Sequence, residues 1–175
     1  IVSYDITTGK ASEVILDGND IKNIGGFDGN IESYEFSKDE TKIIIHQNEE
    51  GVYRHSTKAD VYVFNRASKI ITKVFDQGKI SNPHLSPEGG KIGFVYNNNL
   101  YYKDLIKNTL TQITLDGKKN NIINGMCDWV YEEEFSFTRA FEWSVDGEKI
   151  AYIRFDESKV PEYTMPMYED GAYPR

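Results

Sequence analysis

Short apolar runs separated by polar turns make up most of the chain. Three segments, 36–43, 85–92 and 143–150, follow one pattern of apolar and polar positions. Each begins with an apolar residue and a serine, passes through a turn rich in Asp, Glu or Gly, and ends with Lys-Ile opening an apolar run. Because such turn residues tolerate unusual backbone angles, the pattern predicts a hairpin between two short strands.

A second pattern follows each of the first two hairpins. At 61–72 and 100–114, an apolar run enters a polar turn and leaves it in another apolar run, and the opening residues 2–10 match this pattern alone. Four short strands per unit, with a period of roughly 40–50 residues, are typical of propeller blades. We therefore predict an all-β fold over 1–175, a partial β-propeller of about three to four four-stranded blades. A β-sandwich of similar hairpins is the alternative, which the recurring Ser-turn-Lys-Ile unit disfavours.

Two insertions interrupt the period. The connection between the second and third strands is ten residues longer in the first unit than in the second, and the extra residues lie around 49–56. The connection before the third hairpin is 19 residues longer than the one before the second, and it includes the acidic segment 128–135. Insertions on a repeat scaffold usually project from one face and often carry function, so both are candidate functional segments.

The charge balance argues against a nucleic-acid partner. The 175 residues carry a formal net charge of -8, with a sequence pI of about 4.9, and no basic stripe offsets this charge. A polyanion would be repelled.

No run approaches the ~18 apolar residues of a membrane span. The single cysteine, Cys127, is predicted to be a small buried residue. Because residues 1–5 already read as a strand, we expect the chain to be a segment of a longer protein.

The acidic segment combines three consecutive glutamates, 132–134, with large apolar neighbours. Three glutamates usually form a solvated acidic face. Trp129, Tyr131 and Phe135 favour another interpretation, because such groups are costly to leave on a solvated loop. We expect them to pack against the scaffold as part of a short helix. Two carboxylates held together favour a cation between them, such as a peptide α-ammonium, and Arg54 could hold the pair or bind a substrate carbonyl.

These segments resemble the dipeptidyl peptidase IV family of serine exopeptidases. The string Asp-Trp-Val-Tyr-Glu-Glu-Glu-Phe at 128–135 resembles the family's double-glutamate motif. The Arg-His-Ser at 54–56, with Ala-Asp-Val-Tyr at 59–62, resembles its arginine-bearing hairpin. The stretch from 150–163 to Tyr-Pro at 173–174 also follows the family. The resemblance thus covers nearly the whole chain and is weakest over the first 30 residues.

The resemblance implies a larger, eight-bladed propeller of a bacterial member of the family. It also implies that Glu133 and Glu134 bind the free amino terminus of a peptide substrate, with Arg54 as their partner. Glu132 is the weaker candidate for this contact. No neighbouring subsite residue is transferred, because the spacing from Glu134 to Trp143 is one residue shorter than in mammalian members.

The implied activity is release of Xaa-Pro or Xaa-Ala dipeptides from peptide amino termini. The chemistry would be that of a Ser-His-Asp triad on an α/β-hydrolase domain outside this chain, which contains no Gly-x-Ser-x-Gly elbow. We assign no catalytic residue here, and no cofactor or metal. His46 and His84 are interpreted as scaffold residues, whereas His55 stands beside Arg54. Family analogy places the protein in the periplasm or at the cell envelope, as a homodimer.

Two other functions remain open. Some members of the family lack the catalytic serine and act as binding proteins, so the propeller could be a non-catalytic interaction module. A related tripeptidyl peptidase would anchor the amino terminus one residue further out. A Gly-x-Ser-x-Gly elbow in the full-length protein distinguishes an enzyme from the non-catalytic module. The length of the released peptide distinguishes a dipeptidyl from a tripeptidyl peptidase.

Overall fold

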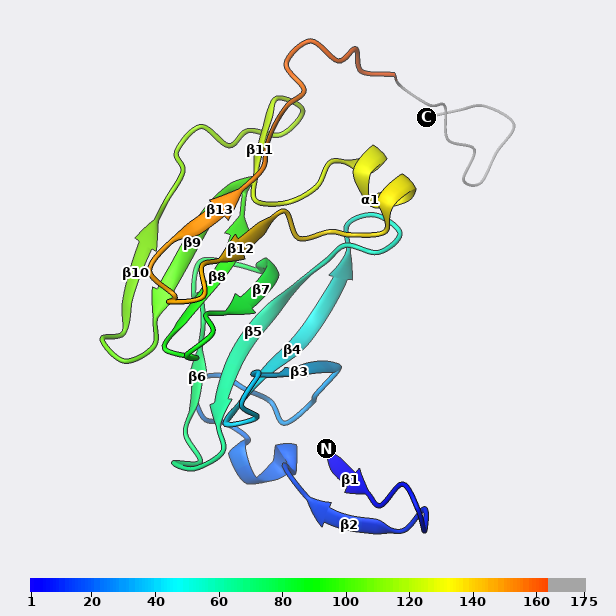
Figure 1. Cartoon of the computed structure of the whole chain (residues 1–175), viewed down its shortest axis with the longest axis vertical. Coiled ribbons are helices and arrows are strands. Elements are labelled where there is room, and N and C mark those ends of the chain that lie inside the picture. The colour runs from blue at the N-terminus through cyan, green and yellow to red at the C-terminus, as the bar shows by residue number, and fades with distance from the viewer. Residues whose placement is uncertain (164–175) are drawn as a thin grey trace.

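Two four-stranded antiparallel sheets form the centre of the molecule (Figure 1). The computed structural model describes residues 1–163. The strands of the first sheet, in spatial order, are β3 (Ser33–Phe36), β4 (Lys42–Gly51), β5 (Thr57–Asn65) and β6 (Ile71–Lys73). Those of the second sheet are β7 (Ser81–Leu85), β8 (Lys91–Tyr96), β9 (Asn99–Asp104) and β10 (Thr109–Gln112). In both sheets the spatial order follows the chain order, as in a propeller blade.

Shorter pairs of strands flank these two blades. On the amino-terminal side, β1 (Val2–Tyr4) pairs with β2 (Ala11–Val14), and a 3-10 helix, η1 (Gly18–Ile21), follows. The elements on the other side are β11 (Ile122–Asn124), the helix α1 (Trp129–Phe135), β12 (Phe141–Trp143), β13 (Ile150–Tyr152) and β14 (Arg154–Asp156). There β12 pairs with β13, and β11 with β14. The predicted partial β-propeller is confirmed.

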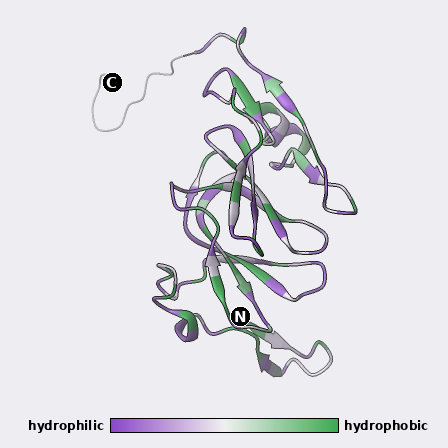
Figure 2. Ribbon diagram, turned by 90° about the vertical axis from the view of Figure 1, so that its left-hand side faces the viewer, coloured by the Kyte–Doolittle hydropathy of each residue, from purple (hydrophilic) through white to green (hydrophobic). Residues whose placement is uncertain are grey.

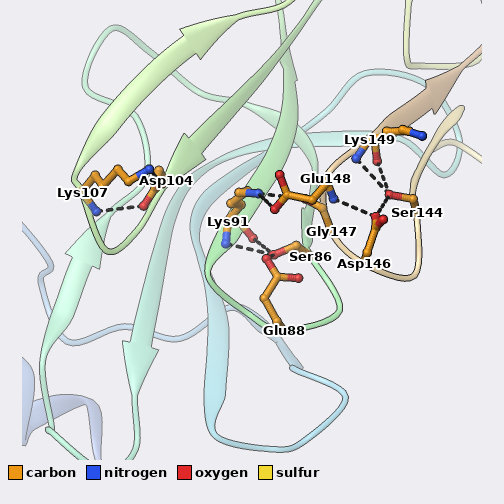
Figure 3. A network of polar contacts seen from close by, with 10 residues as sticks. All are labelled: Ser86, Glu88, Lys91, Asp104, Lys107, Ser144, Asp146, Gly147, Glu148 and Lys149. Carbon is orange, nitrogen blue, oxygen red and sulfur yellow. Dashed lines mark hydrogen bonds and ion pairs between the residues drawn. The ribbon is translucent and has the colours of Figure 1, made fainter.

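The serine-containing turns of the three units are built alike, which explains the repeat. In each, the serine Oγ donates to an acidic side chain two residues on and accepts from the lysine N–H five residues on. The pairs are Ser37–Asp39 and Lys42–Ser37, Ser86–Glu88 and Lys91–Ser86, and Ser144–Asp146 and Lys149–Ser144. Figure 3 shows the second and third of these turns, joined by Lys91, whose Nζ donates to Glu148 at 2.8 Å.

The core lies between the sheets. Side chains alternate across β4, so Ile44 packs into one cluster with β8, whereas Ile43 and Ile45 pack on the other face against Phe27. A third cluster joins Val95 and Leu100 of the second blade to Phe141 of β12. Figure 2 shows the sheets stacked one after another along the long axis. Each of the two four-stranded blades thus packs against a neighbour on both of its faces, as the stacking of repeats requires.

Cys127 is buried, as the sequence predicted. Burial is the main cause that raises the pKa of its thiol to about 11, so the thiol stays protonated near neutral pH. Within residues 1–163, no helix is long and apolar enough to cross a membrane.

Candidate functional site

The first insertion lengthens a hairpin instead of forming a separate loop. β4 and β5 have ten and nine residues, whereas the corresponding β8 and β9 have six each. The longer pair forms an arm whose tip, 52–56, is closed by a hydrogen bond of 2.8 Å from the N–H of Val52 to the carbonyl of Ser56. Figure 1 shows this tip beside α1. The two insertions of the repeat therefore meet.

The second insertion contains the short helix that the sequence predicted. Asp128 caps α1 by accepting a hydrogen bond of 2.8 Å from the N–H of Tyr131, and Ser136 ends it with a left-handed backbone (φ 59°). The expectation that the apolar residues pack on the scaffold holds in part for Tyr131, whose ring lies 4.9 Å from that of Phe155 but stays 38% exposed. It is wrong for Trp129 and Phe135, which stay 55% and 61% exposed.

A buried carboxylate holds the helix to the hairpin arm. Glu132 is only 1% exposed, and its Oε1 accepts hydrogen bonds from the backbone N–H groups of His55 at 2.6 Å and Ser56 at 2.9 Å. Burial acts to raise the pKa of Glu132, but the hydrogen bonds from Ser56 and His55 outweigh it and leave the pKa below its usual value. Sequence reasoning missed this role, because nothing in three consecutive glutamates marks which one turns inward.

The two charged neighbours of this contact form an ion pair. Arg54 Nε lies 3.2 Å from Glu133 Oε2, with the Arg54 side chain 71% exposed and that of Glu133 19% exposed. Glu134 is exposed at the end of the same helix. Within the described part of the chain, no ion pair joins Glu134 to Arg54. The structure therefore brings two of the three predicted site residues, Arg54 and Glu133, into contact. The third, Glu134, follows Glu133 in α1 and has an exposed side chain.

His55 lines a hollow of about 220 Å³ together with Asn82 of β7 and Thr138 from the segment after α1. His46 of β4 lines the same hollow, whereas His84 does not. Thr138 Oγ1 donates to Asn82 Oδ1 at 2.8 Å, and Asn82 Nδ2 donates to the Thr138 carbonyl at 3.2 Å. This reciprocal pair fixes the exit from α1 to the second blade, and no sequence signal indicated it. His84, on β7, pairs with Glu142, and burial lowers its pKa.

The charges favour a single small cation. Glu133 and Glu134 together carry two negative charges and Arg54 carries one positive charge, so one negative charge is left for a ligand. Asp128 and Glu157 are close enough to interact: burial and then Asp128 raise the pKa of Glu157, so its charged form is disfavoured. Among residues 1–163, no group of three or more His, Cys, Asp or Glu side chains is arranged to hold a metal ion.

Comparison with known proteins points to one family. The family described as "Dipeptidyl peptidase IV (DPP IV) N-terminal region" matches residues 37–175. The chain is 34% identical to prolyl endopeptidase FAP of Mus musculus over 177 aligned residues, which cover 100% of the chain and 22% of that protein. It is 36% identical to dipeptidyl peptidase 4 of Felis catus over 153 residues, covering 85% of the chain and 20% of that protein.

A solved structure is similar over the same span. The crystal structure of Porphyromonas gingivalis dipeptidyl peptidase 4 superposes with a TM-score of 0.86 at 38% identity, covering 99% of the chain and 24% of that protein. The chain thus spans about a quarter or less of the length of these relatives. The part of the sequence resemblance at Tyr173 and Pro174 lies outside the described residues.

Proposed function

The chain belongs to the dipeptidyl peptidase IV N-terminal family, and from this premise we propose that it anchors the free amino terminus of a peptide for a dipeptidyl aminopeptidase. Glu133 and Glu134 bind the α-ammonium, and Arg54 holds Glu133 or binds a carbonyl of the same peptide. The nucleophile belongs to the hydrolase part of the full-length protein. The anchor lies at a set distance from that nucleophile. Only two residues fit between them, so the bond after the second residue is the one that is cleaved.

One observation carries the proposal. The 3.2 Å contact between Arg54 and Glu133 joins the tips of two insertions that are far apart in the chain. Both insertions interrupt an otherwise regular repeat. A carboxylate pair with one guanidinium lacks one positive charge, and an α-ammonium, with a reference pKa of about 8, supplies it near neutral pH.

Free and blocked substrates test the anchor directly. The full-length protein is assayed with Gly-Pro-p-nitroanilide and with its N-acetylated counterpart. We expect cleavage of the free amine alone, with KM rising above about pH 8 as the α-ammonium loses its proton. Cleavage of both substrates would support an endopeptidase, the activity named for the FAP relative. Cleavage of neither would support the non-catalytic interaction module.

Substitutions test the residues. Glu133→Gln and Glu134→Gln in the full-length protein should each lower kcat/KM about ten- to a hundredfold, because a charge-assisted hydrogen bond contributes roughly 1.5–3 kcal/mol. Glu148→Gln is the control, since this carboxylate is 69% exposed and lies in the turn at the far end of β12 from α1. Normal kcat/KM in both site variants would refute the anchor.

Product length distinguishes a dipeptidyl from a tripeptidyl peptidase: on a defined peptide, we expect dipeptides and not tripeptides.

We further propose that the chain alone does not hydrolyse these substrates, because it has no Gly-x-Ser-x-Gly elbow. Turnover by the isolated chain would contradict this. The periplasmic or envelope location and the homodimer remain proposals from family analogy.

A further inference from the structure

Glu132 links the two insertions through contacts that are entirely tertiary. Its two donors, His55 and Ser56, are 77 and 76 positions away in the chain. Two successive backbone N–H groups converge on one oxygen of the carboxylate, which is the arrangement that binds anions in proteins. A buried carboxylate without such donors would be costly, and the N–H groups without it would lack an acceptor.

The position of Glu132 in the chain ties this contact to the ion pair. Arg54 directly precedes His55, and Glu133 directly follows Glu132. The buried hydrogen bonds therefore hold the backbone immediately beside both partners of the ion pair. The Arg54 side chain is 71% exposed, so its pairing with Glu133 contributes little to holding the segments together. The relative placement of the pair thus depends on Glu132.

We propose that Glu132 is a positioning residue that sets the spacing of Arg54 and Glu133 before a peptide binds. It does not contact the peptide itself, since its carboxylate is buried against the hairpin tip. Its contribution to peptide binding is pre-organisation: small misplacement of a binding group can cost up to roughly a hundredfold in rate. This inference rests on the proposed function, in which Glu133 and Arg54 belong to the amino-terminal anchor.

Removal of the charge without change of shape is the first test. In the full-length protein, Glu132→Gln keeps an acceptor oxygen but loses the charge that strengthens both hydrogen bonds. With Gly-Pro-p-nitroanilide we expect KM to rise about tenfold and kcat to change less, because the lost contribution is to binding.

Asp104 offers a matched control. Its Oδ1 also accepts two backbone hydrogen bonds, from Ile106 at 3.0 Å and Lys107 at 2.8 Å, and the residue is 8% exposed. It is the last residue of β9, where the turn to β10 begins, away from both insertions. Asp104→Asn should leave KM unchanged while lowering thermal stability. An equal rise of KM in both variants would overturn the positioning role.

A double-mutant cycle distinguishes positioning from a general loss of stability. If Glu132 acts through the ion pair, Glu132→Gln should raise KM less in an Arg54→Met background than in the unmodified protein. Additive effects would overturn the proposal. Should Glu132→Gln accumulate poorly, Glu132→Asp keeps the charge but shifts the oxygen by one methylene group, and a folded variant with normal KM would equally overturn it.

Failure of this inference can be told apart from failure of the proposed function. If Glu133→Gln impairs turnover but folded Glu132→Gln does not, the anchor stands and the positioning role is wrong. If Glu133→Gln has no effect, the anchor itself is wrong, and the positioning role falls with it.

Discussion

At the residue scale, three equivalent positions of the serine-containing turns share a left-handed backbone. Glu40 has φ 56°, Gly89 has φ 69° and Gly147 has φ 67°. The left-handed region suits glycine and costs roughly 1–2 kcal/mol for a residue with a Cβ. Glu40 is therefore the strained member of the set, although its turn makes the same hydrogen bonds as the others.

Glu40→Gly should raise the free energy of unfolding by up to about 1 kcal/mol, because relief of strain exceeds the added backbone entropy of glycine. Urea denaturation measures the change. Gly89→Ala is the reverse control: its new Cβ would lie 3.0 Å from Lys42 Nζ, the movable end of a side chain, so backbone strain dominates. We expect a loss of stability there, and the same sign in both variants would contradict this explanation.

Asp39 makes the stability of its turn depend on pH. The Ser37 hydroxyl and then the Thr41 N–H and hydroxyl lower the pKa of this carboxyl to about 2, from a usual value of 3.8. A lowered folded-state pKa stabilises the protein above the usual value and ceases to do so as pH falls from about 4 towards 2. Asp39→Asn should therefore be less stable than the unmodified chain at neutral pH, with the difference shrinking towards pH 2. Thermal unfolding across that range measures it, and a constant difference would refute the assignment.

At the element scale, the packing of the third unit onto the second depends on one small residue. Gly93 of β8 stands where the first unit has Ile44, which packs into the core between the two blades. A Cβ on Gly93 would lie 2.8 Å from Phe141 Cε2 and 3.4 Å from Trp143 Cζ2. The absence of a side chain thus lets the two aromatic residues of β12 approach β8.

Gly93→Ala should lower the free energy of unfolding by roughly 1–3 kcal/mol, the usual cost of overpacking. Gly51→Ala is the matched control in β4, because the nearest atom to its new Cβ is the Tyr53 carbonyl oxygen at 3.9 Å. Its effect should stay within about 0.5 kcal/mol. Chemical denaturation measures the free energy of unfolding of both variants. An unchanged value for Gly93→Ala would show that β12 can shift away freely.

At the scale of the whole molecule, apolar side chains lie open at both ends of the stack of sheets. Val2, Tyr4 and Val14 are exposed on the β1–β2 hairpin. At the other end, Phe137 and Ile153 line an open hollow of about 370 Å³ over β12 and β13. Complete blades bury such faces against their neighbours.

The isolated chain should therefore self-associate and bind an apolar dye, whereas the full-length protein should bind less dye per chain. Sedimentation velocity at increasing concentration and dye fluorescence measure these two properties. A chain that stays monomeric at high micromolar concentration and binds no dye would show that the exposed faces are too small to drive association.

Much of the fold followed from local chemistry. The Ser-turn-Lys-Ile units predicted hairpins because each turn supplies its own hydrogen bonds within five residues. The hydroxyls of Ser37, Ser86 and Ser144 each donate to an acidic side chain and accept from a lysine N–H. The short helix within 128–135, observed as α1, was predicted for a partly wrong reason. Its exposed Trp129 does not hold it to the scaffold; the buried Glu132 does.

The sequence by itself determined the strand repeat, the two insertions and the family, because these depend on residues close together in the chain and on a highly specific string. Only the tertiary structure decided which glutamate turns inward, that Arg54 lies 3.2 Å from Glu133, and that Asn82 fixes Thr138. These contacts join residues more than 50 positions apart, and their geometry depends on how one blade packs against the next. Local spacing carries no information on that packing, so the arrangement of the site emerged only once the blades were stacked.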